Sequence, residues 1–90
     1  MIAITIYASP GCHLCDEMKA VVSRAARTSR APVTIEVIDI STDADLEARY
    51  GVEIPVLFVD GKKAAKYRVT ENDVIRILKA RASGSSGPGG

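Results

Sequence analysis

The chain has 90 residues, 47% of them hydrophobic, and its 12 basic and 11 acidic residues give a formal net charge of +1. This length predicts a single domain, with enough apolar residues for a core that needs no metal or disulfide staples. The balanced charge gives no reason to expect nucleic acid or an acidic membrane as a partner, and no apolar stretch approaches the roughly 20 residues of a membrane span.

The first part of the chain has the pattern of a strand, a helix and a second strand. Residues 3–7 are apolar or β-branched and end at Ser9-Pro10-Gly11. A helix is expected from about Cys12, because apolar residues then recur at helical spacing on one stripe. Residues 33–38 predict a second strand, and their many β-branched side chains suggest burial on both faces. The helical stripe consists of Leu14, Met18, Val21, Val22 and Ala25.

The middle of the chain predicts a short helix and a hairpin. Residues 42–45 (Thr-Asp-Ala-Asp) resemble a capping box, so a helix should begin there, carry Leu46 and Tyr50 inward and end at Gly51. Residues 56–59 predict a third strand. The Asp-Gly pair at 60–61 then predicts a hairpin turn. The strand after this turn, at about residues 63–67, is rich in lysine, as suits an exposed sheet edge.

The last helix completes an α/β domain over residues 1–82. Residues 70–73 repeat the capping pattern, and Val74, Ile77 and Leu78 should face the core. From residue 83 the chain contains only Ser, Gly and Pro, which predicts a flexible tail over 83–90. The order βαβ, short helix, β-hairpin and C-terminal helix predicts one mixed four-stranded sheet with helices on both faces.

Cys12 and Cys15 are the only cysteines. Two cysteines are too few for the disulfide framework of a small secreted domain, so we expect a soluble, cytoplasmic protein of a reducing compartment. A Cys-x-x-Cys motif between a strand and a helix indicates redox chemistry. Cys12 should lie at or beside the N-cap, where free N–H groups and the helix dipole favour a thiolate. Such a position lowers a thiol pKa from ~8.5 to about 3.5–7.5.

The positions of the two thiols predict their roles. Cys12 attacks a substrate disulfide, and Cys15, more buried and one turn further along the helix, displaces the product. His13, when protonated, would favour the Cys12 thiolate; the alternative is an exposed helix residue without a role. The expected partner is a disulfide-containing protein or a small disulfide, and the expected state is a monomer.

Two other functions stay open from the residues alone. A structural zinc site needs four ligands, and the chain offers only Cys12, Cys15 and His13, so we expect no resident metal and no tightly bound cofactor. A soft metal such as copper(I), or an iron–sulfur cluster shared between two chains, remains an alternative. The second alternative is an adaptor that binds proteins without turnover.

The pieces together resemble the glutaredoxin-like proteins of the thioredoxin superfamily. Residues 7–17 (YASPGCHLCDE) are similar to their active-site segment, and residues 50–58 (YGVEIPVLF) with the Asp-Gly turn to their cis-proline segment. The resemblance implies the thioredoxin fold and thiol–disulfide oxidoreductase activity. It implies that Cys12 is the nucleophile and Cys15 the resolving thiol. It also implies that Pro55, which the base rate for proline would make trans, is cis and faces the cysteines, and that the backbone of Ile54 pairs with substrate.

The chain also departs from that family. Gly11 stands where thioredoxins have tryptophan, and no proline lies between the cysteines. Ser9 occupies the place of the lysine that meets a glutathione carboxylate in glutaredoxins. Lys66-Tyr67-Arg68 occurs in the region of their double glycine, where its cations either replace the lost charge or belong to a lysine-rich edge. Glutathione is therefore a candidate co-substrate, with a thioredoxin-type reductant as the alternative.

Overall fold

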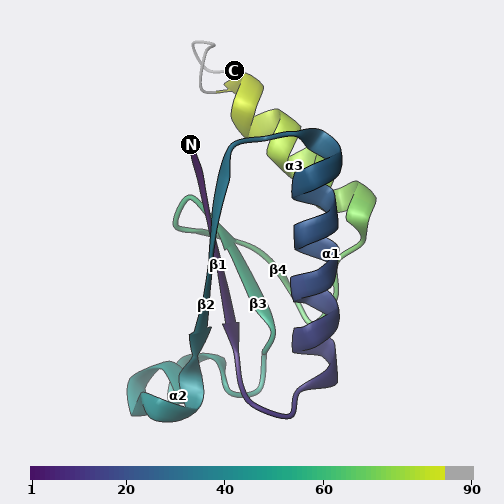
Figure 1. Ribbon diagram of the computed structural model, residues 1–90. Coiled ribbons are helices and arrows are strands. Elements are labelled where there is room, and N and C mark those ends of the chain that lie inside the picture. The colour runs from purple at the N-terminus through teal and green to yellow at the C-terminus, as the bar shows by residue number, and fades with distance from the viewer. Residues whose placement is uncertain (85–90) are drawn as a thin grey trace.

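The elements follow the predicted order. The computed structural model describes residues 1–84, and the seventeen-residue helix α1 is its longest element (Figure 1). Most boundaries lie within one or two residues of the sequence pattern. The elements are β1 (Ile2–Ala8), α1 (His13–Ser29), β2 (Val33–Asp39), the short 3-10 helix η1 (Ile40–Thr42), α2 (Ala44–Tyr50), β3 (Val56–Val59), β4 (Lys62–Lys66) and α3 (Glu71–Gly84).

The four strands form one mixed sheet in the order β2-β1-β3-β4. The βαβ crossover makes β1 and β2 parallel, with Ile4 opposite Ile35, whereas β3 is antiparallel to both β1 and β4. In this register Ala8 lies opposite Asp39, and Tyr7 lies opposite Val56. The end of β1 and the beginning of β3 therefore meet at the same end of the sheet, where the chain leaves β1 toward the cysteines.

The helices cover the two faces of the sheet unequally. The sequence predicts helices on both faces, but α1 and α3 pack against each other on the same face (Figure 1). Helix α2 has no buried residue. It contributes the ring of Tyr50, which stacks on Tyr7 at a centroid distance of 4.8 Å, with Phe58 edge-on to both. The second face is therefore covered only in part, by an aromatic cluster in place of a long helix.

The burial predicted for the second strand is wrong. β2 is an edge strand, and Ile35 and Val37 are 40% and 44% exposed. The β-branched residues identify the strand correctly, but its burial depends on its place in the sheet, which long-range pairing decides. The other edge, β4, is lysine-rich as expected.

One core lies between the sheet and the α1–α3 layer. Alternate residues of β1 point into it, together with one stripe of α1 and the inner face of α3. Helix α3 continues to Gly84, so it enters the stretch predicted as a tail, and the rest of that stretch lies outside the described residues. Within residues 1–84, no helix is both long and apolar enough to cross a membrane. The largest fully buried side chains include Ile4, Ile6, Met18, Leu57 and Leu78.

Candidate functional site

The loop after β1 brings Cys12 to the beginning of α1. Gly11 has a φ of 76°, a left-handed conformation that glycine adopts without a steric penalty. Cys12 follows in extended conformation (φ −92°, ψ 111°) as the N-cap of α1, and its Sγ accepts a hydrogen bond from the Cys15 N–H at 3.1 Å. The predicted position of Cys12 at the helix N-terminus is confirmed. One of the free N–H groups of the helix is therefore aimed at its sulfur.

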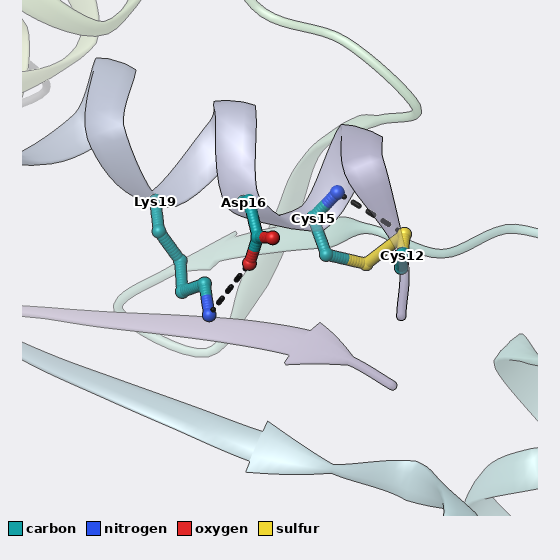
Figure 2. Close-up of a disulfide and its surroundings, with 4 residues drawn as sticks. All are labelled: Cys12, Cys15, Asp16 and Lys19. Carbon is teal, nitrogen blue, oxygen red and sulfur yellow. Dashed lines mark hydrogen bonds and ion pairs between the residues drawn. A yellow bond between two sulfur atoms is a disulfide. The ribbon is translucent and has the colours of Figure 1, made fainter. Parts of the chain in front are cut away.

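The two cysteines form a disulfide in the structure (Figure 2). Their Cα atoms are 5.2 Å apart, within the usual range for such a bond. The two cysteines differ in exposure. Cys15 is only 1% exposed and belongs to the core, whereas Cys12 is half-buried at the margin of the core. An attacking group from outside therefore has access to Cys12 and not to Cys15.

The first turns of α1 carry several charges around the pair. Asp16 and Lys19 form an exposed ion pair of 3.2 Å (Figure 2), and their charges offset each other near the sulfurs. His13 is the first residue of the helix and is exposed. Its proposed influence on Cys12 stays a prediction.

Two further carboxylates lie near this end of the sheet. Asp39 ends β2 opposite Ala8, and the hydroxyl and N–H of Ser41 donate to it and lower its pKa below the ordinary value. A hydrogen bond from Lys63 lowers the pKa of Glu53 in the same direction. Both groups are engaged by their own neighbours, so neither resembles a general base that waits for a proton.

The peptide bond between Ile54 and Pro55 is cis, as the resemblance implies. Pro55 is buried and directly precedes Val56, which lies opposite Tyr7 near the end of β1. Within residues 1–84, no hydrogen bond engages the backbone N–H or C=O of Ile54. The backbone of Ile54 is therefore available to an extended segment from another molecule.

No sequence pattern singles out Tyr67 by itself. Its N–H donates to the Pro55 carbonyl at 2.8 Å, and its hydroxyl donates to the Val52 carbonyl at 3.0 Å. It therefore ties the end of β4 to the segment that contains Ile54 and Pro55. Its φ of 68° is left-handed, a conformation that sequence patterns signal through Gly, Asn or Asp and not through an aromatic residue.

A groove of about 270 Å³ separates α1 from the segment between β4 and α3. On the α1 side it is lined by Leu14, which lies between the cysteines in sequence, by Met18 from the next turn, and by the acidic Glu17. Tyr67, Arg68 and the acidic Asp73 line its other side. The groove therefore begins at the helix turn that carries the redox pair.

The donor groups for a metal are few. Among residues 1–84, no cluster brings together three or more His, Cys, Asp or Glu side chains. Among these residues, the soft ligands for a metal are the two sulfurs of Cys12 and Cys15.

Comparisons with known proteins agree with this geometry. The family model described as "Glutaredoxin-like domain (DUF836)" matches residues 3–79. A structural genomics target protein from X. campestris is 29% identical, with 86% of this chain and 96% of that chain covered and a TM-score of 0.65. A protein from Nitrosomonas europaea is 28% identical, with 86% and 91% covered and a TM-score of 0.71.

The fold extends to more distant proteins. A chloroplastic thioredoxin z matches with a TM-score of 0.74 at 14% identity, over 93% of this chain and 80% of that one. This similarity shows the thioredoxin fold and confirms the predicted fold class. The search of curated proteins found no match.

Proposed function

Because the chain belongs to the family of glutaredoxin-like domains, we propose that it is a thiol–disulfide oxidoreductase, a dithiol carrier whose redox pair is Cys12 and Cys15. The family and the fold make redox chemistry the natural use of two cysteines at disulfide distance. The proposed substrates are disulfides of proteins or of small thiols, with glutathione as a candidate co-substrate.

One observation carries the proposal: the sulfur of Cys12 is the N-cap of a seventeen-residue helix. The hydrogen bond from the Cys15 N–H stabilises negative charge on this sulfur, and the positive end of the helix dipole acts in the same direction. Both effects favour the thiolate, which is the nucleophilic form. Cys15 lies in the core, where burial in apolar surroundings favours the neutral thiol.

The difference between the two sulfurs assigns the steps. The Cys12 thiolate attacks one sulfur of the substrate disulfide; a new S–S bond forms, the old one breaks, and the leaving thiolate takes up a proton. Cys15 then loses its proton and attacks Cys12, which forms the intramolecular disulfide and releases the second substrate thiol. Two electrons pass to the substrate. A thiol reductant restores the pair by the reverse exchange.

Ile54 and Pro55 are proposed to position the substrate. The free backbone of Ile54 would pair with an extended substrate segment, as an added strand does at a sheet edge. Pro55 contributes no N–H, and Tyr67 occupies its carbonyl, so this segment presents Ile54 as its hydrogen-bonding residue. His13 is proposed to adjust the Cys12 thiol through its charge.

A disulfide-reduction assay with single-residue variants tests the proposal. Cys12→Ser should abolish the reduction of a peptide disulfide, whereas Cys15→Ser should still attack and accumulate a mixed disulfide that mass spectrometry detects. Thr34→Ser, at the far end of the sheet from the cysteines, is the matched control and should retain full activity. Activity in Cys12→Ser, or no trapped adduct in Cys15→Ser, would refute the proposal.

The thiol pKa gives an independent test. In the reduced protein, alkylation of Cys12 should be half-maximal at a pH clearly below ~8.5, the value for a free thiol. The Cys15→Ser variant isolates this titration. An ordinary pKa for Cys12 would show that the helix does not activate it.

A further inference from the structure

The two edges of the sheet are built differently. β4 carries three lysines, and its ladder with β3 has a shift in register. Lysine side chains and irregular pairing are common means by which proteins prevent a further strand from adding to an edge. β2, the other edge (Figure 1), pairs with β1 over seven consecutive residues without a shift, and it contains neither lysine nor proline. The edge at β2 is therefore open to a further strand.

The open edge also exposes apolar side chains. Residues 34–37 are all exposed, although Ile35 and Val37 lie opposite core residues of β1 and so share the face that α1 covers. Val33, on the same face, is half-buried and packs against the core. The apolar layer of the core therefore continues to the edge of the sheet, where residues 1–84 provide no strand to cover it.

A second copy of β2 in antiparallel orientation matches this edge. With Ile35 on the two-fold axis, it faces the partner's Ile35, Val33 faces the partner's Val37, and Glu36 faces the partner's Thr34. Pairs of β-branched side chains across antiparallel strands stabilise a sheet. If the axis moved by one residue, the two Glu36 side chains would face each other, and like charges at opposite positions are destabilising.

The charges at the two ends of β2 favour the same orientation. Arg30, just before the strand, and Asp39, its last residue, are both exposed. Hydrogen bonds from Ser41 lower the pKa of Asp39, so its carboxylate is charged at neutral pH. Neither residue forms an ion pair within residues 1–84. Antiparallel pairing brings each Arg30 close to the partner's Asp39, whereas parallel pairing would bring like charges together.

We propose that β2 is the contact surface of a reversible homodimer, in which the two sheets join through antiparallel β2 strands with Ile35 at the two-fold axis. One strand per copy is a small contact, and interfaces below about 1,200 Å² are typical of weak complexes. The dimer should therefore form at high micromolar concentration and dissociate at low micromolar concentration. β1 lies between β2 and β3, so the dimer leaves the segment before β3 uncovered. The inference does not depend on the proposed redox function, and the expected monomer is its alternative.

Analytical ultracentrifugation tests the dimer at protein concentrations from about 1 μM to about 1 mM, the range of Kd for weak complexes. The weight-average mass of the wild type should rise from that of a monomer toward twice that value. Ile35→Lys should remain a monomer throughout, because a lysine at an edge opposes the addition of a strand. Val52→Lys is the matched control, since Val52 is 86% exposed and lies outside β2; it should dimerise as the wild type does.

Three results of this experiment would overturn the proposal. They are a wild type that stays monomeric at the highest concentration, an Ile35→Lys variant that still dimerises, and an equal loss of the dimer in Ile35→Lys and Val52→Lys. Circular dichroism of each variant verifies that it is folded.

A cysteine cross-link tests the register independently, in a protein that carries Cys12→Ser and Cys15→Ala. Ile35→Cys then places two thiols opposite each other, where the Cα atoms of an antiparallel pair are about 4.5–5.5 Å apart, a distance that a disulfide spans. Mild oxidation should give a covalent dimer on a non-reducing gel. Glu36→Cys is the control, because its two copies lie diagonally, about 7–8 Å apart, and should stay largely unlinked. Equal linking of both variants, stronger linking of Glu36→Cys, or no linking of either would reject the proposed pairing.

Discussion

The role of Cys12 as a helix cap leads to a prediction that needs no activity assay. Its Sγ accepts the Cys15 N–H at 3.1 Å, as a serine or threonine oxygen does at many N-caps. Cys12→Ser keeps an acceptor at this position, whereas Cys12→Ala leaves the N–H without one. Both variants lack the disulfide, so its effect on the unfolded chain cancels between them.

The expected difference follows from known capping energies. Replacement of a capping side chain by alanine costs about 0.5–2 kcal/mol, typically ~1. For a domain of this size, ~1 kcal/mol corresponds to about 4–8 °C in Tm. Cys12→Ala should therefore melt several degrees below Cys12→Ser, as circular dichroism at neutral pH would measure under reducing conditions.

Position 15 supplies the matched control, because the same two substitutions should behave differently there. Cys15 is 1% exposed and its side chain caps nothing. Serine would bury a hydroxyl at a cost, and alanine would not. Cys15→Ser should therefore be no more stable than Cys15→Ala, and it should lack the advantage that serine has at position 12. If alanine and serine are equally stable at position 12, the sulfur of Cys12 is not capping the helix.

Three further predictions concern stability and the reductant. Ile4→Ala should cost about 2–5 kcal/mol in chemical denaturation, whereas Ile35→Ala, its neighbour across the sheet, should cost less than about 1 kcal/mol; equal costs would contradict the edge position of β2. Hydrogen bonds from Ala3 and Arg81 lower the pKa of Asp60. Its contribution to stability is therefore present above about pH 4 and is lost as the pH falls further. The Tm difference between wild type and Asp60→Asn should shrink below about pH 4. Oxidised glutathione should form a mixed disulfide with Cys12 in Cys15→Ser, and no adduct by mass spectrometry would favour a protein reductant.

The local features of the fold were predictable because they depend on neighbouring residues. The order of elements followed from hydrophobic periodicity, and the position of Cys12 from the Ser-Pro-Gly loop before a helical stripe. Even among these local features, the residue that caps a helix is uncertain by one position. Asp43, and not Thr42, caps α2, by accepting the N–H groups of Asp45 and Leu46. Adjacent Thr and Asp are both good caps, and the pattern alone does not choose between them.

Features that depend on long-range pairing were not predictable in this way. The exposure of Ile35 and Val37 follows from β2 lying at the sheet edge, which no local pattern encodes. The left-handed backbone of Tyr67 is another example. A tyrosine gives no signal for a positive φ, and the residue becomes interpretable only when its bonds to Val52 and Pro55 are seen.

The difference between local and long-range features also separates the reactivity of Cys12 from the choice of substrate. The proposed activation of Cys12 comes from one helix and its cap, so it depends on a short segment of the sequence. The segments that are proposed to meet the substrate lie before β3 and after β4, and strand pairing brings them to the same end of the sheet. The residues of these two segments therefore lie apart in the sequence from the helix that is proposed to activate the sulfur. Under the proposed function, a substitution at Cys12 should abolish the reduction of every disulfide, whereas a substitution in these segments should change how well a disulfide is bound.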